Sequence, residues 1–396
     1  STACARIIQG EFHDQFVVDM IQGGAGTSTN MNANEVIANI ALEAMGFEKG
    51  DYKQLHPNND VNMAQSTNDA YPTAIRLGLL LGHDSLLTAL DKLIQSLSKK
   101  HLEFSHVLKM GRTQLQDAVP MTLGQEFRAF ATTLGEDLQH LKLLAPTLLT
   151  EVNLGGTAIG TGINADPQYQ LLAVKRLAII SGQPLTPAAD LIEATSDMGA
   201  FVLFSGMLKR TAVKLSKICN DLRLLSSGPR TGINEINLPA RQPGSSIMPG
   251  KVNPVIPEAV NQVAFEVIGN DLALTMAAEG GQLQLNVMEP LIAYKIFDSI
   301  RLLTRAMDML RELCIDGITA NEARCRELME NSIGLITALN PYIGYENATR
   351  IAKVALESGR GVLELVREEK LLGDAELADI LRPENMIAPR LVPLSQ

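Results

Sequence analysis

The stretch PTAIRLGLLLGHDSLLTALDKLIQSLSK, residues 72–99, decides the fold class. Its apolar residues mostly recur at intervals of three or four, which predicts an amphipathic helix of several turns. They are Leu79, Leu80, Leu86, Leu87, Leu90, Leu93, Ile94 and Leu97. A helix of this length is not stable through intrinsic propensity alone, so its apolar face must pack on other helices.

Four further segments repeat this spacing of apolar residues. They cover residues 123–144, 201–225, 254–274 and about 290–314. Alternating patterns typical of strands are nearly absent. The sequence therefore predicts an all-α fold in which long helices form an elongated bundle, with the apolar residues packed in its core.

Composition and charge limit the function classes. The chain has 396 residues, of which 46% are hydrophobic, and a formal net charge of −10. Its longest basic run is Lys99-Lys100, so no patch for a nucleic-acid backbone is expected. It has no run of eighteen apolar residues and does not begin with a signal-peptide pattern. We expect a soluble, cytoplasmic protein with no nucleic-acid or membrane partner.

Cysteine and histidine form no metal-ligating pattern in the sequence. The four cysteines, at positions 4, 219, 314 and 325, contain no CxxC pair. All six histidines lie at or before His140, and neither HxH nor HExxH occurs. We therefore expect no zinc site, and we expect free thiols in a reducing compartment.

The character of the chain changes near Gly317. From there the helical segments are shorter and more highly charged, as in TANEARCRELME, residues 319–330. This change predicts a small C-terminal domain over residues 317–396. The long helices then make a central domain over residues 67–316, and residues 1–66 make an N-terminal domain.

The loop GSSIMPGKVNP, residues 244–254, is similar to a phosphate-binding P-loop only in part. Five residues instead of four separate Gly244 from Gly250, and Val252 replaces the Ser or Thr that would hold magnesium. No strand pattern precedes the loop. These departures argue against a nucleotide-phosphate cradle.

The same loop is suited to a carboxylate. Asn253 before Pro254 predicts a helix that starts at Pro254 and offers free backbone amides to an anion. Lys251 adds a positive charge, and the glycine-rich segment presents Ser245 and Ser246. An ordinary interhelix loop closed by a helix cap is the alternative interpretation of this pattern.

Three other loops carry similar side chains. They are GGAGTSTNMN (23–32), QSTNDAYP (65–72) and GRTQLQDAVP (111–120). Helix capping also explains the first two, with a helix beginning near Pro72, and an ordinary polar turn explains the third. Together the four loops offer hydroxyls, amides, one lysine and one arginine. This inventory favours binding of a small polar dianion over hydrolysis of a polymer.

On these motifs the chain is identified as a member of the aspartase/fumarase superfamily. GSSIMPGKVNP is the superfamily signature, and GGAGTSTNMNANEVIAN, VNMAQSTNDAYPTA, MGRTQLQDAVPMTLGQEF and QLQLNVMEP are similar to its aspartase and fumarase branch. The similarity covers essentially the whole chain, in the same order. Family members carry further residues ahead of the position that matches Ser1, so the N-terminal domain is expected to be partial.

The resemblance implies a fold, an assembly and a reaction. The implied fold is an all-α long-helix bundle with a small helical C-terminal domain and a partial N-terminal domain. The implied assembly is a homotetramer whose central helices form one large bundle and whose active sites each draw loops from three subunits. The implied reaction is the reversible elimination of ammonia from L-aspartate to give fumarate, through removal of a Cβ proton and an aci-carboxylate intermediate.

By the same resemblance, Ser245 is the catalytic base. A serine hydroxyl is normally too weak for this task, so loop amides and the charge of Lys251 must stabilise its alkoxide. The resemblance assigns the remaining residues to substrate binding: the β-carboxylate is held by Thr27, Ser66, Thr67 and Ser246, the α-carboxylate by Lys251 and Asn253, and the amino group by Asn68 and Thr113.

Two positions favour the aspartase branch. Fumarases usually read GTQ where this chain reads Gly26-Thr27-Ser28, and they usually carry histidine at the position of Gln114. Leaving water needs a proton whereas leaving ammonium already has one, so Gln114 is interpreted as a substrate-binding residue that orients by hydrogen bonds. A class II fumarate hydratase and a non-catalytic structural homologue, of the kind found among lens crystallins, are the alternatives.

The expected partners are therefore small molecules, L-aspartate and fumarate, and further copies of the chain. The implied chemistry requires no cofactor. Mg²⁺ is expected only as an activator, and no metal-binding residue is predicted.

Overall fold

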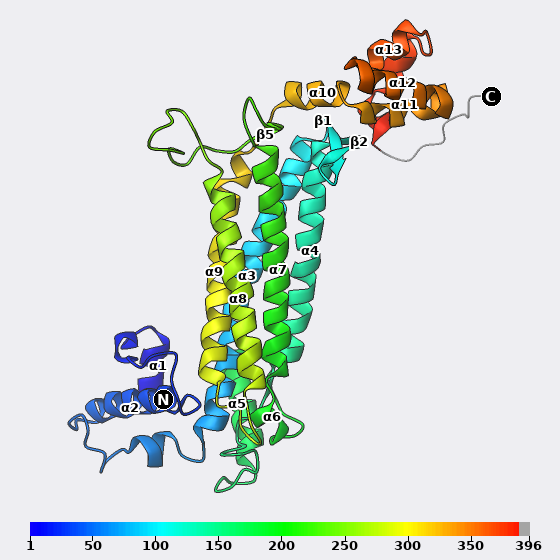
Figure 1. Cartoon of the computed structure of the whole chain (residues 1–396). Coiled ribbons are helices and arrows are strands. Elements are labelled where there is room, and N and C mark those ends of the chain that lie inside the picture. The colour runs from blue at the N-terminus through cyan, green and yellow to red at the C-terminus, as the bar shows by residue number, and fades with distance from the viewer. Residues whose placement is uncertain (388–396) are drawn as a thin grey trace. The chain divides into compact units, whose positions relative to one another are not determined.

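The computed structural model describes residues 1–387, and long helices dominate it (Figure 1). These helices are α3 (Thr67–Glu103), α4 (Leu123–Leu148), α7 (Gly199–Leu225), α8 (Val255–Glu279) and α9 (Glu289–Leu313). They coincide with the five segments of helical apolar spacing in the sequence. The predicted all-α, long-helix fold is confirmed.

Burial in α3 follows the apolar spacing of its sequence. Leu79, Leu86, Leu90, Leu93 and Leu97 are each at most 1% exposed. Burying one leucine side chain contributes about 1.5–3 kcal/mol, whereas an isolated helix in water is only marginally stable. Packing of these faces, more than helix propensity, therefore stabilises the bundle.

The start of α3 differs from the expectation. The helix begins at Thr67 and not near Pro72, which lies inside it. Because Pro72 has no N–H, the carbonyl of Asn68 lacks its usual helical donor. That carbonyl instead accepts a hydrogen bond from Asn153 Nδ2 at 2.9 Å. The proline thus frees a backbone acceptor close to predicted binding residues.

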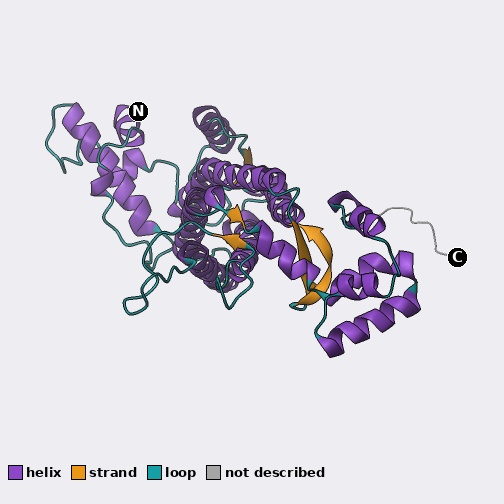
Figure 2. Cartoon of the chain, turned by 90° about the horizontal axis from the view of Figure 1, so that it is seen from above, coloured by secondary structure: helices purple, strands orange, loops and turns teal. Residues whose placement is uncertain are grey.

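Two compact units divide the chain, and the boundary between them falls within each of the five long helices. Unit 1 comprises Ser1–Ala89, Asp137–Val213 and Gln262–Arg305, and unit 2 comprises Leu90–Glu136, Lys214–Asn261 and Ala306–Gln396. In each unit, apolar side chains of the helical segments are buried in a core. Figure 2 shows the helices and strands from above. The expected three-domain boundaries at residues 66 and 316 stay a prediction.

Unit 1 combines its long-helix segments with short elements. Phe201 and Phe204 are fully buried in its core, and the ring of His83 lies 5.8 Å from that of Phe204. The strands β3 and β4 pair in parallel. The short elements are α1 (Thr2–Ile8), η1 (His13–Gln15), α2 (Thr27–Ala44), η2 (Pro57–Val61), β3 (Glu151–Val152), α5 (Tyr169–Ser181), β4 (Thr186–Pro187) and α6 (Glu193–Ser196).

Unit 2 contains a β-hairpin that the sequence analysis treated as a polar turn. Strands β1 (Leu108–Thr113) and β2 (Gln116–Thr122) pair antiparallel, and β5 (Ile236–Asn237) pairs with β6 (Thr319–Ala320). The other short elements of unit 2 are η3 (Ile315–Gly317), α10 (Glu322–Glu330), η4 (Ile333–Leu335), α11 (Ile336–Ile343), α12 (Tyr345–Ser358), α13 (Val362–Glu368), α14 (Asp374–Ile380) and α15 (Pro383–Met386).

The short C-terminal helices have a core of their own. Leu335, Leu339, Ile351 and Val366 are fully buried in it, together with Met110 of β1. The predicted change of character after Gly317 thus corresponds to a separate cluster of short helices. Within residues 1–387, no helix is both long and apolar enough to span a membrane.

Candidate functional site

The predicted binding residues Ser66 and Thr67 lie at the N-terminus of α3 in unit 1. Ser66 Oγ accepts a hydrogen bond from the backbone N–H of Asn68 at 3.2 Å. Thr67 Oγ1 accepts one from Asn30 Nδ2 at 3.1 Å. Within residues 1–387, neither hydroxyl donates to a protein acceptor. Both O–H groups can therefore donate to a bound carboxylate.

Asn68 is held by its side-chain amide. Its Nδ2 donates to the carbonyl of Ala158 at 2.8 Å, which leaves the Oδ1 atom to accept hydrogen bonds. An acceptor oxygen is what a substrate ammonium group requires. The orientation of Asn68 is thus compatible with its predicted contact to the amino group.

Thr27 is the first residue of α2 and is exposed. The preceding Gly26 has φ +86°, and a Cβ there would lie 2.5 Å from the ring of Tyr71. Only glycine permits this backbone conformation and this close approach. Asn30 follows in the same helical turn and contacts Thr67, so the structure joins the first turn of α2 to the start of α3.

Unit 1 also holds a buried carboxyl group, on α9. Glu289 is 1% exposed, and neither of its carboxyl oxygens has a hydrogen-bond partner within residues 1–387. Burial raises its pKa to about 8, although Arg76 opposes the shift. Burial and the proximity of Glu289 also raise the pKa of Tyr71 to about 12. Glu289 is therefore predominantly neutral at pH 7.

Thr113 and Gln114 lie at the exposed tip of the β1–β2 hairpin in unit 2. Thr113 pairs with Gln116, so only Gln114 and Leu115 form the turn. These two residues have φ of 52° and 61°, as a two-residue type I′ turn requires. Both predicted substrate-binding residues are exposed in the unit.

Buried charges anchor the base of this hairpin. Lys109 Nζ lies 2.5 Å from Glu126 Oε2 and 2.7 Å from Glu235 Oε2. Arg112 Nη1 lies 2.8 Å from Glu235 Oε1. Burial alone would lower the pKa of Lys109, but the two carboxylates outweigh it and raise the pKa. Lys109, Arg112, Glu126 and Gln114 also line a cavity of about 320 Å³. The charges thus fix the strand that carries Thr113.

The signature loop is closed at its base. The backbone N–H of Gly244 donates to the carbonyl of Lys251, and Asn253 Nδ2 donates to the carbonyl of Gly244, each at 2.8 Å. A Cβ at Gly244 would lie 2.7 Å from the Lys251 carbonyl oxygen, so the closure needs glycine. The helix beyond the loop begins at Val255, one residue later than expected. Asn253 thus ties the loop together.

Within this closed loop, Ser245 Oγ accepts hydrogen bonds from two backbone amides. The N–H groups of Ile247 and Met248 each lie 3.2 Å from it. Donors aimed at an oxygen favour its negatively charged form. Ser245 is half-buried, whereas Ser246 and Lys251 are exposed. The loop therefore supplies a stabilised serine oxygen flanked by accessible polar groups.

The predicted site residues fall in both units. Unit 1 holds Thr27, Ser66, Thr67 and Asn68, and unit 2 holds Thr113, Gln114, Ser245, Ser246, Lys251 and Asn253. In unit 1, Ser66, Thr67 and Asn68 are adjacent at the start of α3, and the hydrogen bond between Asn30 and Thr67 links them to the first turn of α2, which begins at Thr27. In unit 2, hydrogen bonds join Gly244, Lys251 and Asn253. The substrate roles of these residues stay predictions.

Two supporting residues escaped the sequence analysis. Asp69 accepts backbone hydrogen bonds around Ser66, and Glu235 pairs with Lys109 and Arg112. The spacing Ser66-x-x-Asp69 is a capping-box signal that could have identified the first. Glu235 has no local signal, because its cations lie more than a hundred residues earlier in the sequence. Residues 1–387 contain no cluster of three or more His, Cys, Asp or Glu side chains suited to a metal.

The chain is similar to known families and to known proteins over most of its length. The family described as lyase matches residues 1–269, and the family described as fumarase C C-terminus matches residues 335–388. The aspartate ammonia-lyase of Pseudomonas fluorescens is 89% identical over 394 residues, which cover 100% of this chain and 82% of that protein. That of Escherichia coli K12 is 58% identical over 98% of this chain and 81% of its own length.

Solved structures show the same fold. A fumarate lyase:delta crystallin from Brucella melitensis, bound to cobalt, has a TM-score of 0.95 and 62% identity over 98% of this chain and 84% of that chain. A class II fumarase from Schistosoma mansoni has a TM-score of 0.90 and 35% identity over 97% of this chain and 84% of its own. The chain belongs to the aspartase/fumarase superfamily of lyases.

Proposed function

We propose that the chain is a carbon–nitrogen lyase that catalyses the reversible deamination of L-aspartate to fumarate and ammonia. Within the superfamily, the aspartate ammonia-lyases of three Pseudomonas species are 87–89% identical to it. The observation that carries the chemistry is the closed signature loop, in which two backbone amides point at Ser245 Oγ. No other side chain of this loop offers a comparable oxygen for proton abstraction from Cβ.

Ser245 acts as the base in the proposed mechanism. Its alkoxide is stabilised by the N–H groups of Ile247 and Met248 and by the positive charge of Lys251 when the loop closes over the substrate and excludes water. Proton removal from Cβ places the developing charge on the β-carboxylate, which becomes the aci-carboxylate. The donors around that carboxylate therefore determine the rate.

Four hydroxyls hold the β-carboxylate in this proposal: Thr27, Ser66, Thr67 and Ser246. The oxygens of Ser66 and Thr67 already accept protein hydrogen bonds, so their O–H groups are oriented to donate. Donors bind the doubly charged aci form more tightly than the ground state, and this difference is what accelerates the reaction. One preorganised donor of this kind is typically worth roughly 10²–10³ in rate.

The α-carboxylate and the amino group are held by other residues. Lys251 and Asn253 bind the α-carboxylate, Asn68 and Thr113 contact the amino group, and Gln114 orients the substrate. Asn253 uses one N–H on Gly244, which leaves the second N–H for the ligand. Because ammonium leaves with its proton already in place, Gln114 does not need to act as an acid.

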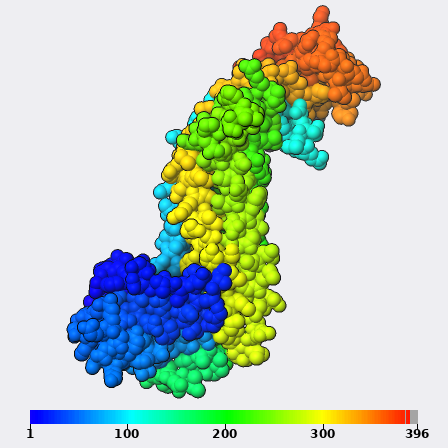
Figure 3. Space-filling view, turned by 60° about the vertical axis from the view of Figure 1, so that its left-hand side comes forward, coloured from blue at the N-terminus to red at the C-terminus, as the bar shows by residue number. Residues whose placement is uncertain are grey.

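We further propose a homotetramer in which each active site combines loops from three subunits. α8 carries a stripe of apolar residues at intervals of three or four: Phe265, Ile268, Leu272 and Met276, which are 36–67% exposed. The helix lies at the surface of the face shown in Figure 3. Such a seam is typical of a helix that packs on helices of another subunit.

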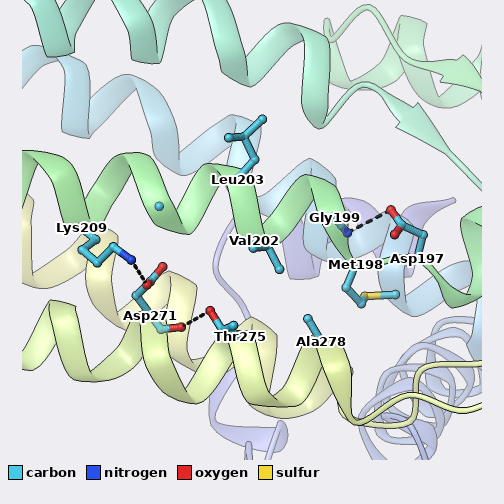
Figure 4. A pocket seen from close by; sticks show the side chains of 10 residues that line it. Asp197, Met198, Gly199, Val202, Leu203, Lys209, Asp271, Thr275 and Ala278 are labelled. Carbon is cyan, nitrogen blue, oxygen red and sulfur yellow. Dashed lines mark hydrogen bonds and ion pairs between the residues drawn. The ribbon is translucent and has the colours of Figure 1, made fainter.

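The neighbouring surface of α7 and α8 in unit 1 supports this assembly. A cavity of about 450 Å³ lies there, lined by Gly199, Val202 and Leu203 on one side and Thr275 and Ala278 on the other (Figure 4). Of these, Gly199 and Ala278 are small and let another helix approach closely. The Asp271 carboxylate in the cavity wall accepts a hydrogen bond from Ser205 and pairs with Lys209.

The proposed chemistry needs no cofactor, and no step of it runs through a metal. Mg²⁺ is proposed only as an activator, with no site assigned among the described residues. The four cysteines are free, and burial raises the thiol pKa of Cys314 and Cys325 to about 12. Free thiols of this kind are usual in a reducing compartment, which supports the proposed cytoplasmic location.

The test follows fumarate absorbance with L-aspartate and, separately, with L-malate. We expect fumarate formation from L-aspartate and none of comparable rate from L-malate. Activity on malate alone would identify a fumarate hydratase. Activity on neither substrate in an intact tetramer would favour a non-catalytic structural homologue.

A further inference from the structure

We propose that Asp69 is a positioning residue that sets the orientation of the binding loop at residues 66–68 through the segment at residues 153–158. This inference rests on the proposed function, since its kinetic consequences require that the loop binds aspartate. Asp69 is completely buried. It therefore acts through its neighbours and does not contact the substrate.

The first carboxylate oxygen of Asp69 orders the start of α3. Oδ1 accepts the backbone N–H of Ser66 at 2.9 Å, while Ser66 Oγ accepts the N–H of Asn68 at 3.2 Å. These two bonds cap the helix N-terminus, one through the side chain of Ser66 and one through the side chain of Asp69. They fix both the backbone and the χ1 angle of Ser66, and so the direction in which its hydroxyl donates.

The second oxygen of Asp69 holds the segment at residues 153–158 against this loop. Oδ2 accepts the backbone N–H groups of Gly155 at 2.9 Å and Thr157 at 3.1 Å. Gly155 has φ +93°, and a Cβ there would lie 2.8 Å from Gln170. The backbone therefore needs glycine at this position to turn its amide toward Asp69.

The segment in turn fixes Asn68. Ala158 accepts the side-chain amide of Asn68 through its carbonyl, and Asn153 Nδ2 donates to the carbonyl that Pro72 leaves free. Asp69 thus positions two of the three binding residues at 66–68. It holds Ser66 directly, and it holds Asn68 through the segment at residues 153–158. The contact between Asp69 and the segment depends on residues about ninety positions apart in the sequence.

The carboxylate is chemically required in this position. All the hydrogen bonds that Asp69 receives come from backbone N–H groups, which are fixed donors. An asparagine would keep one acceptor oxygen, but its NH₂ group would face a donor amide. Burial raises the pKa of Asp69, and the amide donors oppose this effect by favouring the carboxylate.

The test compares Asp69→Asn with the parent enzyme in the aspartate assay, per folded oligomer. We expect kcat/KM for aspartate to fall by about 10–100-fold, as misplacement of binding groups by a fraction of an ångström to one ångström does. Both a rise in KM and a fall in kcat are expected, because the loop contacts the carboxylate in the ground state and in the transition state. Hydrogen exchange at the amides of Gly155 and Thr157 should become faster.

The matched control is Asp298→Asn, which makes the same charge change on α9 of unit 1, at a residue paired with Asn270 and Arg301. Its kinetic constants should stay within about twofold of the parent values, the range of a change remote from the chemistry. If Asp69→Asn does not fold, Asn153→Ala is measured instead. This variant removes the bond to the Asn68 carbonyl without touching a buried charge, and kcat/KM should fall by about 3–10-fold.

The outcomes separate the two proposals. Failure of the parent enzyme to convert aspartate overturns the proposed function. If the parent is active and Asp69→Asn has unchanged kinetic constants, the positioning role alone is overturned. Where Asp69→Asn does not fold, unchanged kinetic constants in Asn153→Ala have the same consequence. A fall in activity matched by an equal fall in folded oligomer has the same consequence, because it assigns Asp69 to stability only.

Discussion

The two units stabilise their buried carboxylates in different ways. In unit 1, Asp69 is surrounded by backbone amides, whereas in unit 2 Glu235 pairs with the side chains of Lys109 and Arg112. Amides are neutral dipoles, so loss of the Asp69 charge leaves no cation behind. Loss of the Glu235 charge would leave cations with too few partners. The binding loop thus depends on local backbone geometry, and the hairpin depends on charge balance.

The predicted site residues of unit 1 and unit 2 also differ in their exposure. Thr67 is buried and Ser66 is half-buried at a helix start, while Ser246 and Lys251 are exposed on a loop closed only at its base. Ser66 and Thr67 of unit 1 are therefore preformed for binding. The unit 2 loop can change conformation without breaking packed contacts, which suits a segment that closes over a substrate.

The largest expected effect concerns this movable loop. Replacing Ser245 with alanine removes the oxygen on which Ile247 and Met248 converge, so kcat should fall by about 10³-fold or more if this oxygen is the base. Because the preformed residues of unit 1 are untouched, the dissociation constant of fumarate should change little. Single-turnover kinetics and fumarate titration measure the two quantities.

The control for Ser245→Ala is the oligomeric state, which should equal that of the parent protein. A variant that keeps kcat within about tenfold of the parent would remove Ser245 from the role of base. A large loss of fumarate affinity would also contradict the division between a preformed binding loop and a movable reactive loop. Either result would contradict the difference proposed between the two units.

The second prediction concerns the charge balance in unit 2. Glu235→Gln should destabilise the protein by about 3–5 kcal/mol, the usual cost of removing one partner from a buried ion pair. Lys109 would keep only Glu126, and Arg112 would lose its carboxylate. Denaturant unfolding or the melting temperature measures the change.

The matched control for this prediction is Glu126→Gln. Glu126 is partly exposed and, among residues 1–387, pairs with Lys109 alone, so its loss should destabilise the protein markedly less than the loss of Glu235. Equal destabilisation by the two variants would mean that the number of cations paired with a carboxylate does not decide its contribution. The contrast with the amide-bound Asp69 would then lose its physical basis.

The sequence predicted the parts of this molecule that depend on local patterns. The apolar spacing of residues 72–99 located α3, and the Gly, Ser and Asn loops located the groups at its N-terminus. It could not predict contacts between distant segments. The amides of Gly155 and Thr157 reach Asp69 only after the chain folds, and Lys109 meets Glu235 across more than a hundred residues. Neither pairing follows from residue spacing.

The turn of the hairpin was missed for a different reason. Gln114 and Leu115 adopt positive φ although neither is Gly, Asn or Asp, the residues that normally mark a type I′ turn. The buried charges at the base of β1 hold the hairpin and impose the turn on residues with no preference for it. Tertiary contacts outweighed local propensity at this position.

The smallest expected effect concerns Glu289, a buried carboxyl of unit 1 that has no hydrogen-bond partner within residues 1–387. Its pKa is about 8 in the folded protein and lies near 4.5 in an unfolded chain, so the folded state binds the proton more tightly. Stability from this group is therefore complete below about pH 4.5 and is lost as the pH rises through 8. Glu289→Gln, which resembles the protonated acid, should remove this loss.

We expect the melting temperature of Glu289→Gln to approach that of the parent at pH 5 and to exceed it at pH 8.5 by on the order of a few degrees. Differential scanning calorimetry at both pH values measures the difference. The control is Glu151→Gln, which changes an exposed carboxyl in the same unit. A Glu289→Gln variant that is less stable at pH 8.5 than at pH 5, relative to the parent, would show that the ionised carboxylate stabilises unit 1. Glu289 would then need a charge partner of the kind that Glu235 has in unit 2.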